Sequence, residues 1–271
     1  LTETDLVYAQ TTDGVSSLLL DVYYPMAGNG HPVLVLLHGG SGDRKSSDFV
    51  EFSSRLAEED VVVFNVSAPY RGQSPQGLVS EQGLGLRSGL EAARCAVRYA
   101  RQQAGQYGGD GARITIVGQS AGGVFGALTV LGGEEILEKW EAFEATGGPA
   151  DQVQCVEPIA TAVQGFVGFN GAYFVFNSIA GLPEEQPELW DIINLYGYIG
   201  NHPTLAVRFL FGNADVQTPG WHIEQSSRFI DSLQAAGYDA DTAVVSAGHN
   251  FNFQGAGWDK TLEVVLSVVR R

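Results

Sequence analysis

Short apolar runs alternate with longer amphipathic stretches along this chain. The first apolar runs have the length of strands and cover Ser17–Tyr24, Pro32–Leu37 and Val61–Val66. Ser47–Glu59 lies between two of them and carries large apolar residues on one helical face. A longer helix is predicted by apolar residues that recur at spacings of four and three, namely Leu86, Leu90, Ala93, Val97, Ala100 and Ala104.

The same alternation continues through the second half of the chain. Arg113–Val117 is the next predicted strand, and a stretch of small residues that favours a helix follows it. Later strands are predicted at Pro158–Phe169, Leu205–Phe211 and Thr242–Ser246, and later helices at Pro219–Ala236 and Leu262–Val269. Strands that alternate with helices indicate a mostly parallel sheet covered by helices, so we expect a single α/β domain over residues 1–271.

Two segments interrupt this rhythm. Gly132–Cys155 includes an acidic amphipathic helix around Glu134–Ala145. Gly165–Gly200 holds more aromatic residues than even spacing along the chain would give. Such an excess favours a substrate pocket or lid, although some of these residues also fit a core strand. We therefore expect a small lid insertion within residues 132–200.

Composition and charge narrow the classes of partner. Hydrophobic residues make up 44% and charged residues 17% of the chain, which indicates a folded protein with a sizeable core. The net charge of -16 repels phosphate backbones, so we expect no nucleic-acid partner and no strongly anionic substrate. No apolar run approaches the ~20 residues of a membrane-spanning helix. The expectation is a soluble protein, cytoplasmic or secreted, with its oligomeric state open.

The two cysteines, Cys95 and Cys155, are too few for a disulfide framework. They are compatible with one bridge or with two buried thiols, and both alternatives stay open at this point. The histidines and cysteines show no C-x-x-C or H-E-x-x-H spacing. We therefore expect neither a metal nor a cofactor.

The segment GQSAG, from Gly118 to Gly122, has the G-x-S-x-G spacing of a nucleophile elbow. Side chains two residues before and after the serine would collide in so tight a turn, which explains the glycines. A glycine-rich turn without catalytic function would match the motif alone. Because this one joins a predicted strand to a predicted helix, we expect Ser120 to be the nucleophile and the amide of Ala121 to donate to an oxyanion.

A second glycine-rich loop, HGGSG at residues 38–42, follows the second predicted strand. Glycines let backbone N–H groups approach a developing negative charge that a side chain would block. We expect Gly39 or Gly40 to supply the second oxyanion donor. His38 is expected to brace the loop through hydrogen bonds rather than to act as an acid or base.

His249 is the best candidate for the general base. It lies in a glycine-containing loop after the last predicted strand, and it follows the serine as the order Ser, Asp/Glu, His requires. His31 and His202 precede prolines at the opposite end of the predicted sheet, and His222 lies on a predicted helix.

The catalytic acid is expected after the strand that lies between the nucleophile and the base. Asp215 follows Leu205–Phe211 in the loop FGNAD, where its carboxylate would orient His249 and stabilise the protonated imidazole. Asp191 and Glu224 are alternatives, but one lies in the aromatic segment and the other on a predicted helix.

Taken together, HGGSG, YGGDGARITIVGQSAGG, FGNADVQTP and AGHNF resemble the esterase and lipase branch of the α/β-hydrolases. The GQSAGG stretch is most similar to carboxylesterases and hormone-sensitive-lipase-like enzymes. This resemblance implies an α/β-hydrolase fold with an eight-stranded, mostly parallel sheet, helices on both faces and hydrolysis without a cofactor. It also implies a triad of Ser120, Asp215 and His249. The loop reads HGGSG rather than a run of three glycines, which leaves its donor open.

The expected function is that of a serine carboxylesterase that hydrolyses small or short-chain carboxylic esters through an acyl-enzyme. Gln119, Phe166 and Trp221 are expected to contact the ester. A peptidase or amidase with the same triad is the nearest alternative. A binding protein without catalysis is a further one, although such proteins commonly lose a member of the triad.

Overall fold

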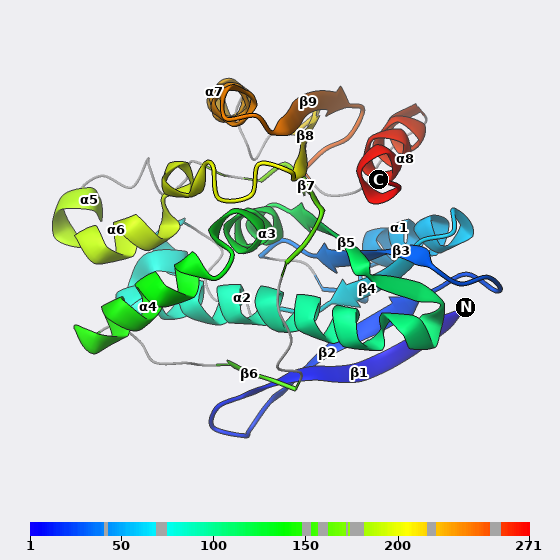
Figure 1. The fold of residues 1–271 in the computed structure, drawn as a ribbon, viewed down its shortest axis with the longest axis horizontal. Helices are drawn as coiled ribbons and strands as arrows, with labels where there is room; N and C mark the ends of the chain where they lie inside the picture. The colour runs from blue at the N-terminus through cyan, green and yellow to red at the C-terminus, as the bar shows by residue number, and fades with distance from the viewer. Residues whose placement is uncertain are drawn as a thin grey trace.

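A computed structural model of the protein describes residues 1–40, 43–68, 75–147, 153–156, 162–171, 173, 182–215, 221–249 and 256–271. For residues 75–84, 182–183, 221–222, 225 and 256 it describes the backbone only. The described residues form a central sheet with helices on both of its faces (Figure 1).

The sheet has the strand order β6-β1-β2-β4-β3-β5-β7-β8-β9. Its strands are β1 Thr2–Thr11, β2 Ser17–Tyr23, β3 His31–Leu37, β4 Val62–Val66, β5 Gly109–Gln119, β6 Val153–Cys155, β7 Gly165–Phe169, β8 Ala206–Gly212 and β9 Asp239–Val245. The six strands from β4 to β9 in this order are parallel. Because parallel strands end at one edge, the loops after β3, β5, β8 and β9 share that edge.

The sheet has nine strands, one more than the eight that the resemblance implied. The additional strand is β6, which pairs antiparallel with the outer side of β1 and places Cys155 opposite Ala9. β1 was not predicted either, because its first residues are polar and exposed. By contrast, β3 and β4 are buried on both faces, and their continuous apolar runs predicted them well.

Helices cover both faces of the sheet, as expected (Figure 1). One face is covered by α1 (Ser47–Glu58) and α8 (Ala256–Val269), and the other by α2 (Pro75–Gln103), α3 (Ala121–Gly132) and α7 (Trp221–Ala235). A single 3-10 turn, η1 (Ala104–Tyr107), connects α2 to β5. None of the described helices is both long and apolar enough to cross a membrane.

The helix α3 is buried along almost its whole length. Every residue from Gly122 to Gly132 is buried, and the helix packs against β5 and β7. Small residues allow this close approach: a Cβ on Gly126 would lie 2.8 Å from the ring of Phe166. The turn that precedes α3 is therefore held by a rigid core.

A group of short helices lies at the left of Figure 1. It comprises α4 (Glu135–Ala145), α5 (Leu182–Glu185), α6 (Pro187–Ile193) and the 3-10 turn η3 (Leu195–Tyr198). Lys139 joins α4 to α6 through an ion pair with Asp191 at 3.2 Å. The Tyr198 hydroxyl donates to the Ile192 carbonyl at 2.7 Å. These helices fall within residues 132–200, where a lid insertion is predicted.

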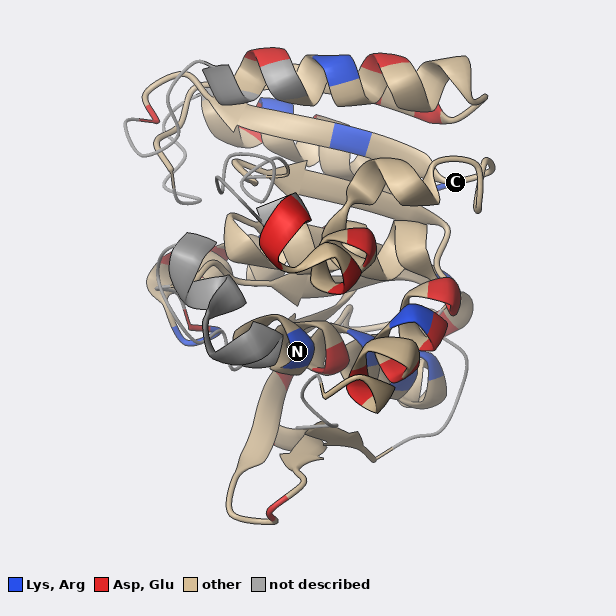
Figure 2. Ribbon diagram, turned by 90° about the vertical axis from the view of Figure 1, so that its left-hand side faces the viewer, with Lys and Arg blue, Asp and Glu red and all other residues tan. Residues whose placement is uncertain are grey.

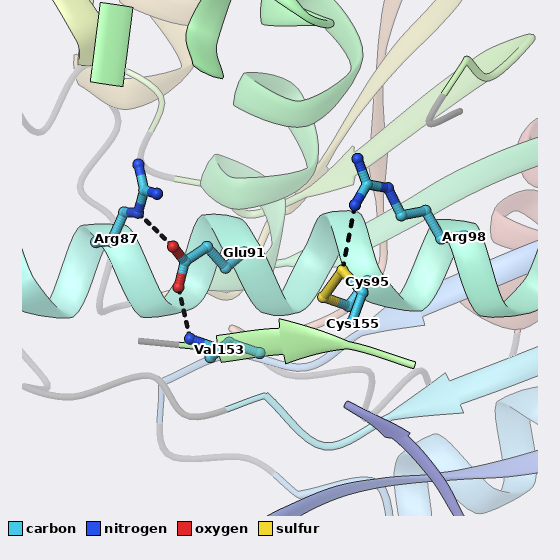
Figure 3. The surroundings of a disulfide bond; sticks show 6 residues. All are labelled: Arg87, Glu91, Cys95, Arg98, Val153 and Cys155. Atoms are coloured by element: carbon cyan, nitrogen blue, oxygen red, sulfur yellow. Dashed lines mark hydrogen bonds and ion pairs between the residues drawn. A yellow bond between two sulfur atoms is a disulfide. The ribbon is translucent and has the colours of Figure 1, made fainter. Parts of the chain in front are cut away.

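Cys95 and Cys155 form a disulfide that ties α2 to the edge strand β6 (Figure 3). A second contact supports the same strand, since the backbone N–H of Val153 donates to the Glu91 carboxylate at 2.8 Å. Three residues of strand bury too little surface to hold an edge alone. The sequence left open whether the two cysteines form one bridge or two buried thiols, and the structure has the bridge.

Replacing both cysteines by serine is expected to lower the free energy of unfolding by about 2–4 kcal/mol, because the bridge closes a long loop in the unfolded chain. The loop is long because the two cysteines are 60 positions apart. Urea unfolding of the double variant measures this loss. Wild-type protein unfolded in the presence of a reductant is the control and should give the same midpoint as the variant. Equal midpoints for oxidised wild type and variant would contradict the prediction.

Candidate active site

Ser120 occupies the single residue between the end of β5 and the start of α3. Its backbone has φ 52° and ψ -117°, a conformation that only glycine adopts readily. A Cβ on Gly118 would lie 2.3 Å from the Gly122 carbonyl oxygen, so the glycines are required at this turn. The Ser120 N–H donates to the carbonyl of Phe169 at 2.9 Å, which fixes the turn to the end of β7. This is the geometry that the G-x-S-x-G spacing predicted.

The loop after β3 packs directly against this turn. A Cβ on Gly39 would lie 3.1 Å from the Cβ of Ser120 and 2.3 Å from Oε1 of Gln119. Ala121 is the first residue of α3, where backbone N–H groups have no partner within the helix. The backbone of Gly39 and the first turn of α3 thus lie beside the serine, where the oxyanion donors are predicted.

His38 braces the first part of this loop, as predicted. Its Nε2 accepts the backbone N–H of Ala68 at 3.0 Å, and its Nδ1 lies 2.6 Å from the carbonyl oxygen of Gly39. Since an N–H can only donate, Nε2 is unprotonated and the ring is neutral with its proton on Nδ1. Burial lowers the pKa of His38, which keeps the ring in this form.

Arg44 anchors the far end of the same loop. The guanidinium is buried and lies 3.1 Å from the carboxylate of Asp21, and it donates to the Ser67 hydroxyl at 2.8 Å. The Asn65 side chain donates to the carbonyl of Arg44 at 2.9 Å. Sequence analysis did not single out these residues. The available signal was a polar residue inside each of two apolar strands, Asp21 in β2 and Asn65 in β4.

The structure brings Asp215 and His249 together from loops after adjacent strands. Oδ2 of Asp215 lies 2.9 Å from Nδ1 of His249, and the two side chains are 3% and 12% exposed. Both rivals of Asp215 are engaged elsewhere: Asp191 pairs with Lys139 on α4, and Glu224 pairs with Arg228 at 2.7 Å. Asp215 is the carboxylate placed to orient the base.

Two of the three predicted substrate contacts need correction. Phe166 is 1% exposed and packs edge-on against the rings of Tyr173 and Phe209, so it belongs to the core. Gln119 is 2% exposed, and its Nε2 donates to the carbonyl of His249 at 2.9 Å. Its side chain holds the base loop instead of facing a substrate. The side chain of Trp221 lies outside the described part of the chain.

The short helices at the left of Figure 1 are acidic. Figure 2 views this side of the molecule and shows red acidic positions on these helices. The acidic residues on α4, α5 and α6 are Glu135, Glu138, Glu141, Glu144, Glu184, Glu185, Glu188 and Asp191. Lys139 is the basic residue within those three helices. The local field therefore has the same sign as the net charge and disfavours anions.

Comparison with known proteins agrees with this architecture. A family model described as the carboxylesterase family matches residues 8–133. Thermogutta terrifontis esterase 2 with propionate bound superimposes with a TM-score of 0.67 at 22% identity, over 98% of this chain and 92% of the other. A truncated carbohydrate esterase from gut microbiota gives a TM-score of 0.67 at 16% identity, over 100% and 97% of the two chains.

Curated relatives match over shorter stretches. Secreted lipase 4 of Gibberella zeae is 36% identical over 34% of this chain and 17% of its own length. A probable isoprenylcysteine alpha-carbonyl methylesterase of Arabidopsis thaliana is 26% identical over 59% of this chain and 29% of its own. The chain thus spans less than a third of the length of these relatives.

The sheet order and the strand–serine–helix turn are those of the α/β-hydrolase fold. Within that fold, the chain is similar to the carboxylesterase family over residues 8–133 and to esterase relatives over parts of its length.

Substituting Arg44 by alanine is expected to destabilise the protein by up to about 3–5 kcal/mol, because the buried carboxylate of Asp21 then keeps only the half-exposed Lys45, at 3.4 Å, as a cationic partner. Urea unfolding gives this difference directly. Arg228→Ala also removes an arginine from an ion pair, but on an exposed helix face, and should leave the unfolding midpoint unchanged. Equal effects of the two substitutions would show that Arg44 does not anchor the loop.

Proposed function

We propose that this protein hydrolyses small carboxylic esters through an acyl-enzyme on Ser120. The observation that carries the proposal is the contact of 2.9 Å between Asp215 and His249, at the same edge of the sheet as the strained turn of Ser120. Nucleophilic acyl transfer needs a serine held on such a turn, beside an imidazole that a carboxylate orients.

The proposed reaction has two halves. Nδ1 of His249 is engaged by Asp215, which leaves Nε2 to remove the proton from Ser120 as Oγ attacks the ester carbonyl carbon. Backbone N–H groups of Ala121 and of Gly39 or Gly40 stabilise the oxyanion. When the tetrahedral intermediate collapses, the C–O bond to the alcohol breaks and the alcohol leaves with the proton from Nε2. Water then attacks the acyl-enzyme by the same route and releases the acid.

The names of several relatives support esters as the class of substrate. The names of the curated relatives include a lipase, a methylesterase and two further esterases. The solved structures with the same fold include an esterase with propionate or butyrate bound. These products have three and four carbons, and they favour a short acyl chain as the preferred substrate here.

The central test is hydrolysis of p-nitrophenyl esters over a range of acyl lengths by wild type and Ser120→Ala. We expect wild-type activity to be highest with short acyl groups, and kcat of the variant to fall by at least ~10³-fold because the nucleophile is lost. Ser54→Ala is the matched control, because this hydroxyl bonds to the Val50 carbonyl within α1. Retained turnover in Ser120→Ala would refute the assignment. A wild type inactive on every ester would favour the peptidase or binding-protein alternatives.

The net charge of -16 predicts discrimination by charge. A p-nitrophenyl ester of succinate carries a carboxylate, and its kcat/KM should be lower than that of the neutral butyrate ester of similar size. Raising the salt concentration should narrow the difference, because salt screens charges more than ~10 Å apart at 0.1 M. Equal kcat/KM values, or a difference that salt leaves unchanged, would show that this field does not act on the substrate.

A further inference from the structure

Asn170 is a buried polar residue at the centre of the site whose function the triad does not explain. It follows β7, the strand that lies between the nucleophile strand β5 and the acid strand β8. Its side chain is 1% exposed. A buried amide at this position must have its hydrogen-bonding groups satisfied by the protein.

The Asn170 side chain connects the acid loop to the base loop. Its Nδ2 donates to the carbonyl of Gly248 at 2.8 Å and to that of His249 at 3.1 Å. Its Oδ1 accepts the backbone N–H of Gly212 at 2.8 Å. One amide therefore bonds to both segments that carry the Asp215–His249 pair.

Only an asparagine side chain satisfies all three of these partners. Gly212 offers a donor, whereas Gly248 and His249 offer acceptors, so the site needs one acceptor and two donors on a short side chain. An aspartate could accept from Gly212 but would place its other oxygen against two carbonyl oxygens. These partners also fix which amide atom is the oxygen.

The backbone at the same point reaches the third member of the proposed triad. The Phe169 carbonyl accepts the N–H of Ser120, and the Asn170 N–H donates to the carbonyl of Leu210 on β8, both at 2.9 Å. Asn170 has φ 45°, a conformation that asparagine tolerates better than most residues. The tip of β7 thus contacts the nucleophile turn, the acid strand and the base loop.

Within the described residues, both side chains and backbone hold the base loop: the Ala247 carbonyl accepts the N–H of Ala214, in the acid loop, at 2.9 Å. The His249 carbonyl accepts from Asn170 and also from Nε2 of Gln119, so two buried amides hold the backbone of the base from different sides. The Gly248 carbonyl is held by Asn170. Loss of Asn170 would leave the base loop tied to Gln119 and, through the backbone bond from Ala214 to Ala247, to the acid loop. It would remove the side-chain link between Gly212 and the carbonyls of Gly248 and His249.

We propose that Asn170 is a positioning residue that holds the acid and base loops in register, so that the Asp215–His249 contact persists through the reaction. This inference rests on the proposed function, because it acts through the proposed pair. Asn170 does not contact the ester. Its loss should therefore reduce kcat while leaving KM nearly unchanged.

The test uses Asn170→Gly, because glycine accepts φ 45° and only the side chain is lost. We expect kcat for p-nitrophenyl butyrate to fall about 10- to 100-fold, as for a misplacement of about 1 Å, with KM within about twofold of wild type. Asn170→Asp, which keeps the shape and the acceptor, should lose kcat to a similar degree. Asn194→Gly is the control: it removes a side-chain hydrogen bond from the Tyr196 N–H at the start of η3 and should leave kcat unchanged.

A double-mutant cycle shows whether Asn170 acts through the pair. Asp215→Asn alone should reduce kcat by about 10⁴-fold. In that background, Asn170→Gly should reduce kcat by no more than about twofold, because the contact that it positions is already lost. A purely structural contribution would instead appear in full in both backgrounds.

The outcomes separate this inference from the proposed function. Wild-type kcat in Asn170→Gly, or an undiminished effect in the Asp215→Asn background, overturns the positioning inference while the loss of activity in Ser120→Ala still supports the triad. Wild-type kcat in Asp215→Asn overturns both. If Asn170→Gly does not fold, the same cycle is run with Asn170→Asp, and additive effects there overturn the inference.

Discussion

The close packing of the first turn of α3 against the end of β3 is the constraint on which the arrangement around Ser120 depends. A Cβ on Gly122 would lie 2.5 Å from the carbonyl oxygens of both Leu37 and His38. The chain can pass from β5 to α3 in so little space only with Ser120 at φ 52°. Such a conformation costs a non-glycine residue about 1–3 kcal/mol. The burial of α3 from Gly122 to Gly132 offsets this cost and holds the loop after β3 beside the serine.

Buried polar side chains then hold the loops that this packing brings together. Arg44 and Asn65 fix one end of the loop after β3, and His38 fixes the other. Asn170 and Gln119 do the same for the loop that carries His249. Each of these side chains is buried and therefore cannot exchange its partners for water. The loops of the site gain a defined geometry although loops ordinarily have few interactions of their own.

The disulfide and the candidate site lie toward different edges of the sheet. The disulfide and Glu91 hold β6 to α2 at one edge, whereas the proposed triad lies on loops between β5 and β9 toward the other. The acidic helices α4 to α6 add negative charge to one side of the molecule (Figure 2). Because the disulfide and the candidate site lie apart, the disulfide can hold the edge strand β6 without restricting the loops of the site.

The sequence by itself determined the elements and residues whose signals are local. Periodicity predicted α1, the later part of α2 and the central strands, and glycine spacing predicted the turn at Ser120. Chain order singled out Asp215 and His249, because loops after parallel strands meet at one edge. Only the tertiary structure decided the pairing of β6, the bridge between Cys95 and Cys155, the burial of Phe166 and Gln119, and the contacts of Asn170. Each of these depends on partners that lie far apart in the chain. An asparagine after a strand has the same local signature whether it forms an ordinary turn or joins two catalytic loops.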